Sequence, residues 1–541
     1  MPTVAEVMAQ TLRELGVTRM CGLPGGETLE FIDAAHQAGI RFILTRREET
    51  AAFMADALGQ IERQPGVCLA TLGPGAMNLA LGVANAYLDR SPMIAITATL
   101  ARSAAPYATH QNVDLNAVYR PFTKATWLLD GCDTAATVRR AWRLALEPRP
   151  GPVHLALAGD VARLEDVAAD GPSAIDVSVP PLGPPSLPDL AAVADRLARA
   201  RRPVVILGLD LAPYPPDRAL RAFLETLNVP VFVAPKAKGA IPEDHPLFFG
   251  VCAGVAADHV IVDFFRRADL LVGIGYDPVE SNRIWHQALP LVSLGPLSIA
   301  ADRFRPLAEC PGDLQATLAA MRQRTFGPYE WTDAELAAFR AEMEATLHPP
   351  VDSPRGLSPV EVTRRLRALV PRDAIVTTDV GAVKFITSQA FTTWEPMTFL
   401  QSNGLSSMGF ALPGAMAARL AHPGRPVVCT VGDGGFGMCL ADVETCVRER
   451  LPFLTVVFND RQLSLIQVIQ RNKHLPGCGV EYGPVDFAAA AEAMGAIGLR
   501  ASTMAEFEAA VKQGLAADRL TVVDVQIDPA EYESHTKACA L

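Results

Sequence analysis

The chain of 541 residues is half apolar and one-fifth charged, and its formal net charge is −11 at pH 7. This is the composition of a globular protein with room for about three or four domains of roughly 150 residues. The negative charge argues against a surface for nucleic acid or for an anionic membrane, although backbone N–H groups and a metal ion could still hold a phosphorylated cofactor.

The ten cysteines are scattered and include no C-x-x-C pair, which makes a zinc site or a redox pair a poor interpretation. We expect reduced thiols in a cytoplasmic protein. Residues 1–17 form an amphipathic, partly acidic segment rather than a signal peptide. No run approaches about 18 apolar residues, so we expect no membrane span.

Helices and strands alternate through the first third of the chain, which predicts a parallel sheet with helices on both faces. We place this first domain at 1–170, with its last strand near 151–161. The expected helices are 3–16, 27–39, 48–62 and 76–89, and the expected strands are 19–23, 41–46, 66–72 and 92–99.

A Pro-rich stretch at 172–188 predicts a linker. We place a second α/β domain at 186–325 and a third at 355–541, joined by a less regular stretch at 325–356. The sequence therefore predicts three tandem, doubly wound α/β domains. The elements expected in them are helices at 189–200, 217–228, 358–370 and 408–421, and strands at 203–209, 229–234, 373–381 and 521–527, and the stretch 267–280 also belongs to the second domain.

The segment 431–460, "VGDGGFGMCLADVETCVRERLPFLTVVFND", contains G-x-G-x-x-G at Gly432, Gly434 and Gly437. It follows an apolar strand and enters a helical pattern, which is the outline of a dinucleotide-binding turn. Asp433, however, puts a carboxylate where a phosphate should approach. In a parallel βαβ unit Asp433 and Asn459 come to the same edge of the sheet.

Oxygen-bearing side chains at one edge suit Mg²⁺, which often completes its octahedron with diphosphate oxygens. The glycines would let the backbone approach such a diphosphate, and the following helix would offer its N-terminus. The alternative is a nicotinamide site. It gives Asp433 no role, and Asp460 lies somewhat beyond the usual ~20 residues for a ribose ligand. A lone G-x-G-x-x-G favours neither interpretation strongly.

The motif "GDGGFG…FND" resembles the G-D-G…N signature of thiamine-diphosphate-dependent enzymes. The resemblance covers almost the whole chain and is closest to the acetolactate-synthase-like and 2-oxo-acid decarboxylase branch. It implies a pyrimidine-binding, a central and a diphosphate-binding domain. The matching stretches, in order, are "LPGGETLEFIDA", "TLGPGAMNLALGVANAYLDRSPMIAITA", "RPFTK", "KGAIPEDHPLFFG", "GYDPVE" and "GLSSMGFALPGAMAARLA".

The resemblance implies that a glutamate of the first domain bonds the pyrimidine N1′, which shifts the cofactor to its imino form so that it removes its own C2 proton. In the family this glutamate lies eight residues before the Asp of an "A-D-G-Y"-like stretch. Here that stretch is "ADAL" with Asp56, so the resemblance assigns the role to Glu48. We expect Glu49 to be an ordinary carboxylate in the first turn of a helix.

By the same resemblance Met408 is wedged between the two cofactor rings, and the carbonyl of Ser406 accepts from the 4′-amino group. A core methionine is the alternative for Met408. The implied metal ligands are Asp433, Asn459 and the backbone carbonyl of Arg461. The other implied cofactor contacts are Gly25, Gly73, Pro74, Asn78, Gly432, Gly434, Gly435 and Leu463.

The stretch "ATHQNVD" bears on the substrate. Pyruvate-decarboxylase-like relatives have two histidines here, and acetolactate synthases have Phe then Gln, whereas this chain has His110-Gln111. We expect Gln111 to face the cofactor-bound intermediate. His110 either shuttles protons or caps a loop.

The helix after the metal motif reads "NDRQLSLIQVIQ". Simple decarboxylases have a Glu six residues after the Asn to help protonate the enamine, and here that residue is Leu465. The absence of this Glu favours carboligation. Ile469 replaces the Trp by which biosynthetic acetohydroxyacid synthases prefer 2-oxobutyrate. The "GYDPVE" stretch resembles the FAD-independent catabolic enzymes, so we expect no flavin.

The sequence departs from the family at Ala382-Val383, where the biosynthetic pattern has Gln-His after "TTDVG". Lys124 of "RPFTK" either has a structural role or steers a carboxylate. The terminal "HTKACAL" is either an active-site lid or a frayed tail.

Together these features predict a thiamine-diphosphate- and Mg²⁺-dependent carboligase of a pyruvate-like 2-oxo acid. The resemblance also implies a homodimer or homotetramer with active sites between subunits, because Glu48 and Asp433 of one site come from different subunits. The alternatives are a simple decarboxylase, a lyase of a 2-hydroxy ketone or 2-hydroxyacyl-CoA, a silent homologue and, last, a NAD-dependent dehydrogenase.

Overall fold

The structure is a computed structural model that describes residues 1–167, 175–211, 218–252, 254–280, 289–301, 304–351 and 355–536. The chain forms two compact units that do not follow the order of the sequence. The first unit combines 1–180 with 404–423 and 439–451, and the second contains the remainder. Two segments from the C-terminal third are therefore part of the N-terminal unit.

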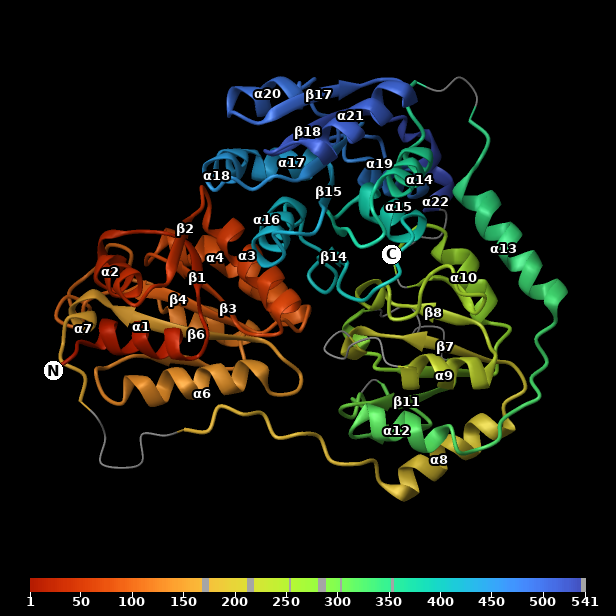
Figure 1. Cartoon of the computed structure of the whole chain (residues 1–541), viewed down its shortest axis with the longest axis horizontal. Coiled ribbons are helices and arrows are strands. Elements are labelled where there is room, and N and C mark those ends of the chain that lie inside the picture. The colour runs from red at the N-terminus through yellow and green to blue at the C-terminus, as the bar shows by residue number, and fades with distance from the viewer. Residues whose placement is uncertain are drawn as a thin grey trace. The chain divides into compact units, whose positions relative to one another are not determined.

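The first unit contains a six-stranded, all-parallel sheet with the order β2-β1-β3-β4-β6-β5. Helices cover both faces (Figure 1), which is why β3 and β6 are buried along their whole length. The strands are β1 (Arg19–Leu23), β2 (Arg41–Leu44), β3 (Gly66–Ala70), β4 (Met93–Thr99), β5 (Thr126–Leu128) and β6 (Pro152–Ala158). The helices are α1 (Val4–Glu14), α2 (Leu29–Gln37), α3 (Glu48–Glu62), α4 (Pro74–Leu88), α5 (Leu115–Tyr119), α6 (Thr134–Leu146), α7 (Gly159–Ala162), α16 (Ala411–Ala421) and α18 (Val443–Arg448).

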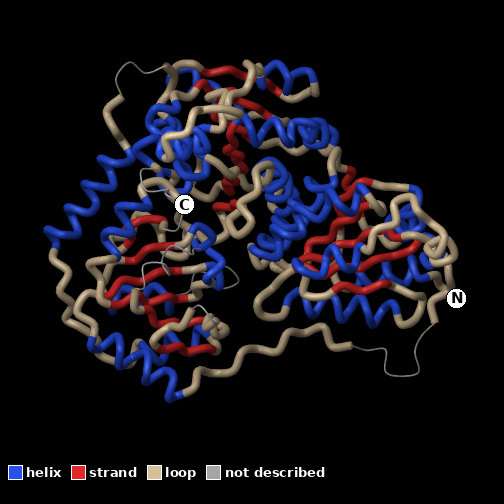
Figure 2. Tube along the Cα trace, turned by 180° about the vertical axis from the view of Figure 1, so that it is seen from behind, coloured by secondary structure: helices blue, strands red, loops and turns tan. Residues whose placement is uncertain are grey.

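The second unit contains two more six-stranded parallel sheets, ordered β12-β11-β10-β7-β8-β9 and β14-β13-β15-β16-β18-β17. Figure 2 shows their strands between layers of helices. The strands are β7 (Pro203–Leu207), β8 (Val231–Val233), β9 (Phe248–Val251), β10 (Leu270–Ile274), β11 (Leu291–Gly295), β12 (Ala308–Pro311), β13 (Ile375–Thr378), β14 (Phe399–Gln401), β15 (Val427–Gly432), β16 (Leu454–Asn459), β17 (Ile497–Ala501) and β18 (Thr521–Gln526). The helices are α8 (Leu187–Arg199), α9 (Arg218–Leu227), α10 (Asp258–Phe265), α12 (Leu314–Met321), α13 (Asp333–Leu347), α14 (Pro359–Leu369), α15 (Ala382–Ala390), α17 (Asp433–Cys439), α19 (Ser464–Asn472), α20 (Phe487–Ala493), α21 (Met504–Ala516) and α22 (Tyr532–His535).

The predicted α/β fold with three parallel sheets is confirmed. The expected linker at 172–188 is without regular structure from 175 to 186, while 172–174 lies outside the described residues. The helix that follows starts at Leu187, because Ser186 caps it and Pro188 suits its first turn. The domain boundaries remain a prediction.

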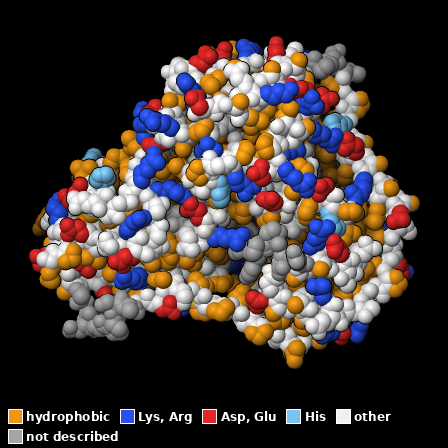
Figure 3. Space-filling view, viewed as in Figure 1, with side chains coloured by type: hydrophobic (Ala, Val, Ile, Leu, Met, Phe, Trp, Pro, Cys, Tyr) orange, Lys and Arg blue, Asp and Glu red, His pale blue; other side chains and the backbone are white. Residues whose placement is uncertain are grey.

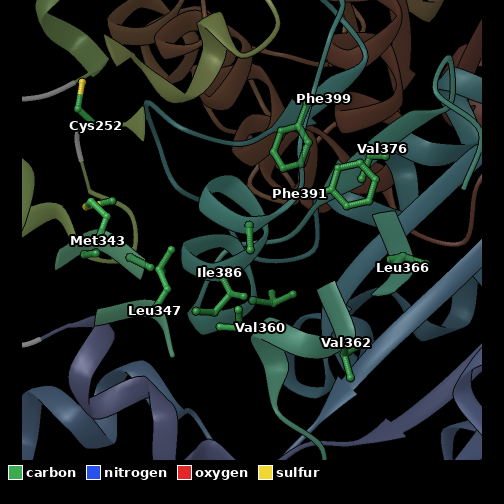
Figure 4. Close-up of a cluster of buried hydrophobic side chains, with 14 of the residues drawn as sticks. Cys252, Met343, Leu347, Val360, Val362, Leu366, Val376, Ile386, Phe391 and Phe399 are labelled. Carbon is green, nitrogen blue, oxygen red and sulfur yellow. The ribbon is translucent and has the colours of Figure 1, made fainter. Parts of the chain in front are cut away.

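The expectation of an irregular stretch at 325–356 was wrong in its middle, because α13 occupies 333–347. A capping box between Thr332 and Glu335 starts this helix. Its buried face is only three residues long, Phe339, Met343 and Leu347, and so leaves a weak periodic signal. Figure 4 shows two of these side chains in the core that also contains residues from α14, α15 and β13.

No helix among the described residues is long and apolar enough to cross a membrane. On the face shown in Figure 3, basic and acidic side chains are interspersed.

Candidate active site

The carboxyl edge of the third sheet brings together the two side chains that the motif predicted. Gly432 at the end of β15 pairs with Phe458 of β16, so Asp433 and Asn459 follow adjacent strand positions. Asn459 in turn pairs with Gln526 of β18. Asp433 is 7% exposed and Asn459 is 3% exposed. The structure thus places a carboxylate and an amide side by side at this edge, as the sequence predicted.

A hydrogen bond to Asp524 sets the orientation of Asn459. The amide nitrogen Nδ2 donates to Oδ1 of Asp524 at 2.9 Å, and Oδ1 of Asp524 also accepts from Gln526 Nε2 at 3.0 Å. Because the amide nitrogen is engaged there, the amide oxygen is the atom of Asn459 that remains to bind a ligand. Sequence reasoning missed Asp524, since nothing in "TVVDVQI" marks that aspartate as a partner of a residue 65 positions away.

Two neighbouring carboxyl groups at this edge are destabilised in their charged forms. Burial raises the pKa of Asp433 to about 6, although N–H groups of Gly434 and Arg461 partly offset it. Burial, and next the charge of Asp433, raises the pKa of Asp460 to about 7. A bound cation would favour both ionised forms.

The donor set at this edge consists of oxygen atoms, which fits a hard cation such as Mg²⁺. Among the residues that the structure describes, no group of three or more His, Cys, Asp or Glu side chains is placed to hold a metal ion. In addition to the carboxylate of Asp433, a metal here would therefore need the amide oxygen of Asn459 and a backbone carbonyl as ligands. Arg461 has a φ of 62°, an uncommon value for a non-glycine residue, so the chain turns sharply at the predicted carbonyl ligand.

The glycine turn is closely packed from behind. A Cβ at Gly435 would lie 1.8 Å from Oδ2 of Asp379, so no larger residue fits. Gly434 donates its N–H to Oδ1 of Asp433 at 2.8 Å. Gly432 faces Val383, whose Cγ1 lies 3.8 Å from the position of a Cβ there. Val383, one of the two residues at which the sequence departs from the family pattern, thus lies directly against the turn.

The candidate residues on α19 lie beyond this edge. Leu463 precedes the helix and donates its N–H to the carbonyl of Val480 at 2.7 Å. Leu465 and Ile469 are half-buried on it. The nine residues of α19 include no Asp or Glu.

In the first unit, Glu48 is the first residue of α3 and is 7% exposed. Its Oε2 accepts from Asn78 Nδ2 at 3.0 Å, and its Oε1 lies 3.1 Å from where a Cβ at Gly75 would be. The structure therefore brings two predicted residues, Glu48 and Asn78, into direct contact. Glu49 is paired with Arg47 through a 2.7 Å contact, which fits the ordinary role expected for it.

The first turn of α4 forms a glycine cradle beside Glu48. Gly73 has a φ of 60° and precedes Pro74, which begins the helix. A Cβ at Gly73 would lie 3.1 Å from the side chain of Gln111. The hydroxyl of Tyr119 donates to the carbonyl of Ala76 at 2.6 Å and fixes this turn from behind.

The remaining predicted residues of this unit lie in loops. His110 and Gln111 are exposed, and Gln111 has a φ of 54°. The ring of His110 makes no hydrogen bond to the described residues, so its role as a loop cap finds no support in this structure. Ser406 has a φ of 56° and is exposed, and Met408 is half-buried just before Phe410, which packs edge-on against Phe53 at 5.8 Å.

Gly25, an implied cofactor contact, and Lys124, for which two roles were open, also lie in this unit. Gly25 follows β1, and a Cβ there would lie 2.2 Å from Oγ1 of Thr71, so the backbone is in close contact at this point. Lys124 donates to the carbonyl of Glu147 at 2.8 Å, and burial lowers its pKa to about 8. This contact favours the structural interpretation of Lys124.

Sequence reasoning also missed Asp442, which is fully buried. It accepts hydrogen bonds from Arg46 and Thr50, on either side of Glu48.

The terminal residues 537–541, part of the stretch that was predicted to be a lid or a tail, lie outside the described residues.

Three stretches of the chain match family models of known proteins. Residues 2–118 match the thiamine pyrophosphate enzyme N-terminal TPP binding domain, residues 190–321 match the central domain, and residues 379–525 match the C-terminal TPP binding domain. An acetolactate synthase of Bacillus subtilis is 30% identical over 97% of this chain and 93% of its own length. A catabolic acetolactate synthase of Raoultella terrigena is 30% identical over 97% and 95%. A probable 2-ketoarginine decarboxylase of Pseudomonas aeruginosa is 30% identical over 97% and 94%.

Proposed function

Because the chain belongs to the thiamine pyrophosphate enzymes, within their acetolactate-synthase-like group, we propose that it decarboxylates a pyruvate-like 2-oxo acid and joins the remaining fragment to a second carbonyl compound. When bound, thiamine diphosphate supplies the carbanion that attacks the 2-oxo acid and stabilises the charge left after CO₂ departs. The chain's own residues bind, orient and move protons.

Glu48 holds a proton at the pyrimidine nitrogen of the cofactor. Its burial at the start of α3 and its bond to Asn78 support this role, because they point the carboxylate in one direction. Gly25, Gly73 and Pro74 would allow close approach of the cofactor, the carbonyl of Ser406 would accept from its amino group, and Met408 would pack against its rings.

Asp433, the amide oxygen of Asn459 and the carbonyl of Arg461 bind Mg²⁺ in this proposal. Support comes from the oxygen donor set, the bond that orients Asn459 and the raised pKa of Asp433. Gly432, Gly434, Gly435 and Leu463 border the diphosphate.

One observation carries the choice of carboligation over simple decarboxylation: α19 includes no carboxylic acid and has Leu465 at the position of the family's proton donor. An acid within reach of the reacting carbon would speed protonation and release of an aldehyde. Leu465 cannot donate a proton, so a second carbonyl compound has time to react. Gln111 orients the reacting fragment by hydrogen bonding.

The second candidate is a plain 2-oxo-acid decarboxylase. The similarity to a probable 2-ketoarginine decarboxylase favours it, as does the exposed imidazole of His110, since histidine is a common proton donor in catalysis.

Product analysis distinguishes the two candidates. The purified protein is incubated with cofactor, Mg²⁺ and a panel of 2-oxo acids, and we expect mainly an acetohydroxy acid or 2-hydroxy ketone. Leu465→Glu should shift the products toward free aldehyde. The control is Gln467→Glu, which adds an acid to the same helix but keeps an oxygen to accept from Arg471. Stoichiometric aldehyde from the wild type with abundant acceptor would establish the decarboxylase, and His110→Phe would then identify its proton source.

No flavin takes part in this proposal. In the central sheet, Oε2 of buried Glu280 accepts from the N–H of Leu209 at 2.6 Å. This bond lies between the carboxyl ends of the adjacent strands β7 and β10, where a dinucleotide phosphate would bind. A flavin absorption band in the purified protein would contradict this part.

The enzyme works as a homodimer or homotetramer in which Glu48 and Asp433 of one site come from different subunits. Mixing Glu48→Gln with Asp433→Ala protein tests this, because mixed dimers would regain an intact site, whereas a one-chain site would stay inactive.

The nine cysteines that the structure describes are free thiols, which supports a cytoplasmic location.

A further inference from the structure

Asp442 lies far from Glu48 in the sequence but belongs to the same compact unit. It ends a short 3₁₀ helix, Leu440–Asp442, and its side chain is fully buried. Its Oδ1 accepts from the backbone N–H of Arg46 at 2.8 Å, and its Oδ2 accepts from Thr50 Oγ1 at 2.7 Å. Thr445, three residues after Asp442, also donates to Oδ1, at 2.8 Å. The carboxylate therefore joins the residues two before and two after Glu48.

The start of α3 has no side-chain cap of its own, and the bonds from Arg46 and Thr50 tie it to this distant carboxylate. Arg47 occupies the N-cap position and makes no side-chain capping bond. The first N–H groups of a helix need partners, and a missing cap leaves the first turn free to shift. Glu48 is the first residue of that turn, so the direction of its side chain follows the backbone at 46–50.

The segment that carries Asp442 is fixed to the first unit at further points. Arg448 donates to the carbonyl of Leu44, at the end of β2, and Glu449 pairs with Arg41 on the same strand. These bonds place Asp442 firmly beside the junction between β2 and α3.

We propose that Asp442 is a positioning residue for Glu48, acting through Thr50 and the N–H of Arg46. The proposal rests on the role proposed above for Glu48, and adds that a residue 394 positions along the chain sets the direction of its carboxylate. Asp442 does not touch the cofactor in this scheme.

Variants of Thr50 test the proposal with little change in shape. Thr50→Val removes the hydroxyl donor and keeps the volume, and Thr50→Ser keeps the donor. The matched control is Thr445→Val, which removes a hydroxyl donor to the same carboxylate but lies outside the 46–50 segment, three residues after Asp442. Thermal melting shows that each variant is folded.

The first measurement uses the protein without cofactor. Amide hydrogen exchange, followed by mass spectrometry, should be about tenfold faster in a peptide spanning 44–52 for Thr50→Val, and unchanged for Thr50→Ser and Thr445→Val. Equal exchange in Thr50→Val and wild type would overturn the proposal, as would an equal effect of Thr445→Val.

The second measurement is hydrogen–deuterium exchange at C2 of the bound cofactor. We expect Thr50→Val to slow it about 10- to 100-fold, because small displacements of a catalytic group have effects of this size. Cofactor affinity should change less than about threefold, and Thr50→Ser should restore the rate. An unchanged rate in Thr50→Val would overturn the proposal. If Glu48→Gln itself exchanges normally, the role of Glu48 is wrong, and the cofactor-free measurement still decides whether Asp442 orders the start of α3.

Discussion

The carboxylate of Asp524 offers a direct test of the metal site, because it orients Asn459 without being a predicted ligand. Asp524 is 1% exposed and accepts from Asn459 Nδ2 at 2.9 Å, Gln526 Nε2 at 3.0 Å and the N–H of Phe487 at 3.3 Å. The substitution Asp524→Ala removes all three bonds. The amide of Asn459 can then rotate, and its oxygen is no longer directed at the metal.

The size of the effect follows from the bond that is lost. A hydrogen bond to a charged acceptor contributes about 1.5–3 kcal/mol, and each 1.4 kcal/mol changes an equilibrium constant about tenfold. Loss of a group that orients a metal ligand weakens metal binding by about 10- to 100-fold in known sites. The nearby negative charge is also lost, which acts in the same direction. We therefore expect Mg²⁺ to bind about 10- to 100-fold more weakly to Asp524→Ala.

Calorimetric titration of Mg²⁺ at saturating thiamine diphosphate measures this change. Asp524→Asn keeps an acceptor oxygen for Asn459 and should lose less affinity. The control is Asp313→Ala, which also removes a carboxylate and a helix cap, that of α12, and so lowers stability at a residue whose side chain bonds Ala316 and not Asn459. If folded Asp524→Ala binds Mg²⁺ within about twofold of the wild type, then Asp524 does not hold Asn459 as a ligand and the reasoning fails.

Glu48→Gln should leave cofactor binding nearly intact but slow C2 exchange by about 10²- to 10⁴-fold, whereas Glu49→Gln should have little effect; normal exchange in the first variant, measured by NMR, would reject the assignment. Gly435→Ala places a Cβ 1.8 Å from a buried carboxylate oxygen and should lower the free energy of unfolding by about 1–3 kcal/mol, while Gly437→Ala, with open space around it, should not; urea titration compares them. Burial lowers the pKa of His154 to about 3, so the unfolded chain takes up a proton below pH 6.5 that the folded chain refuses, and stability falls as pH decreases. We expect the free energy of unfolding to fall by about 2 kcal/mol between pH 7 and 5 for this reason. Urea titrations at both pH values should show a smaller fall for His154→Gln.

The architecture was predictable because its signal is local. Fully buried parallel strands leave apolar runs, and their alternation with helices indicates the sheet class without any knowledge of contacts. The same locality explains the error at α13, whose three buried residues, Phe339, Met343 and Leu347, are too few to stand out against a polar helix.

The site was predictable only where residues belong to a motif. Asp433 and Asn459 were expected at one edge of the sheet, and the strand register confirms that adjacency. Asp524 and Asp442 were missed because their partners are 65 and 392 to 396 positions away, and each sits in a sequence where an aspartate has no local reason to be noticed. Hydrogen bonds across such separations depend on tertiary packing. The roles of the catalytic and cofactor residues remain predictions.

The interleaved composition of the first unit also constrains how the protein can be made. Most of α3 is buried from Thr50 to Gly59, and α16 supplies part of its cover, as Figure 1 shows. When residue 180 leaves the ribosome, α16 is still roughly 240 residues from leaving it, a delay on the order of 10 to 50 seconds at about 5–20 residues per second. The nascent domain therefore waits with an apolar helix face uncovered, and a fragment ending at 180 keeps that exposed face permanently.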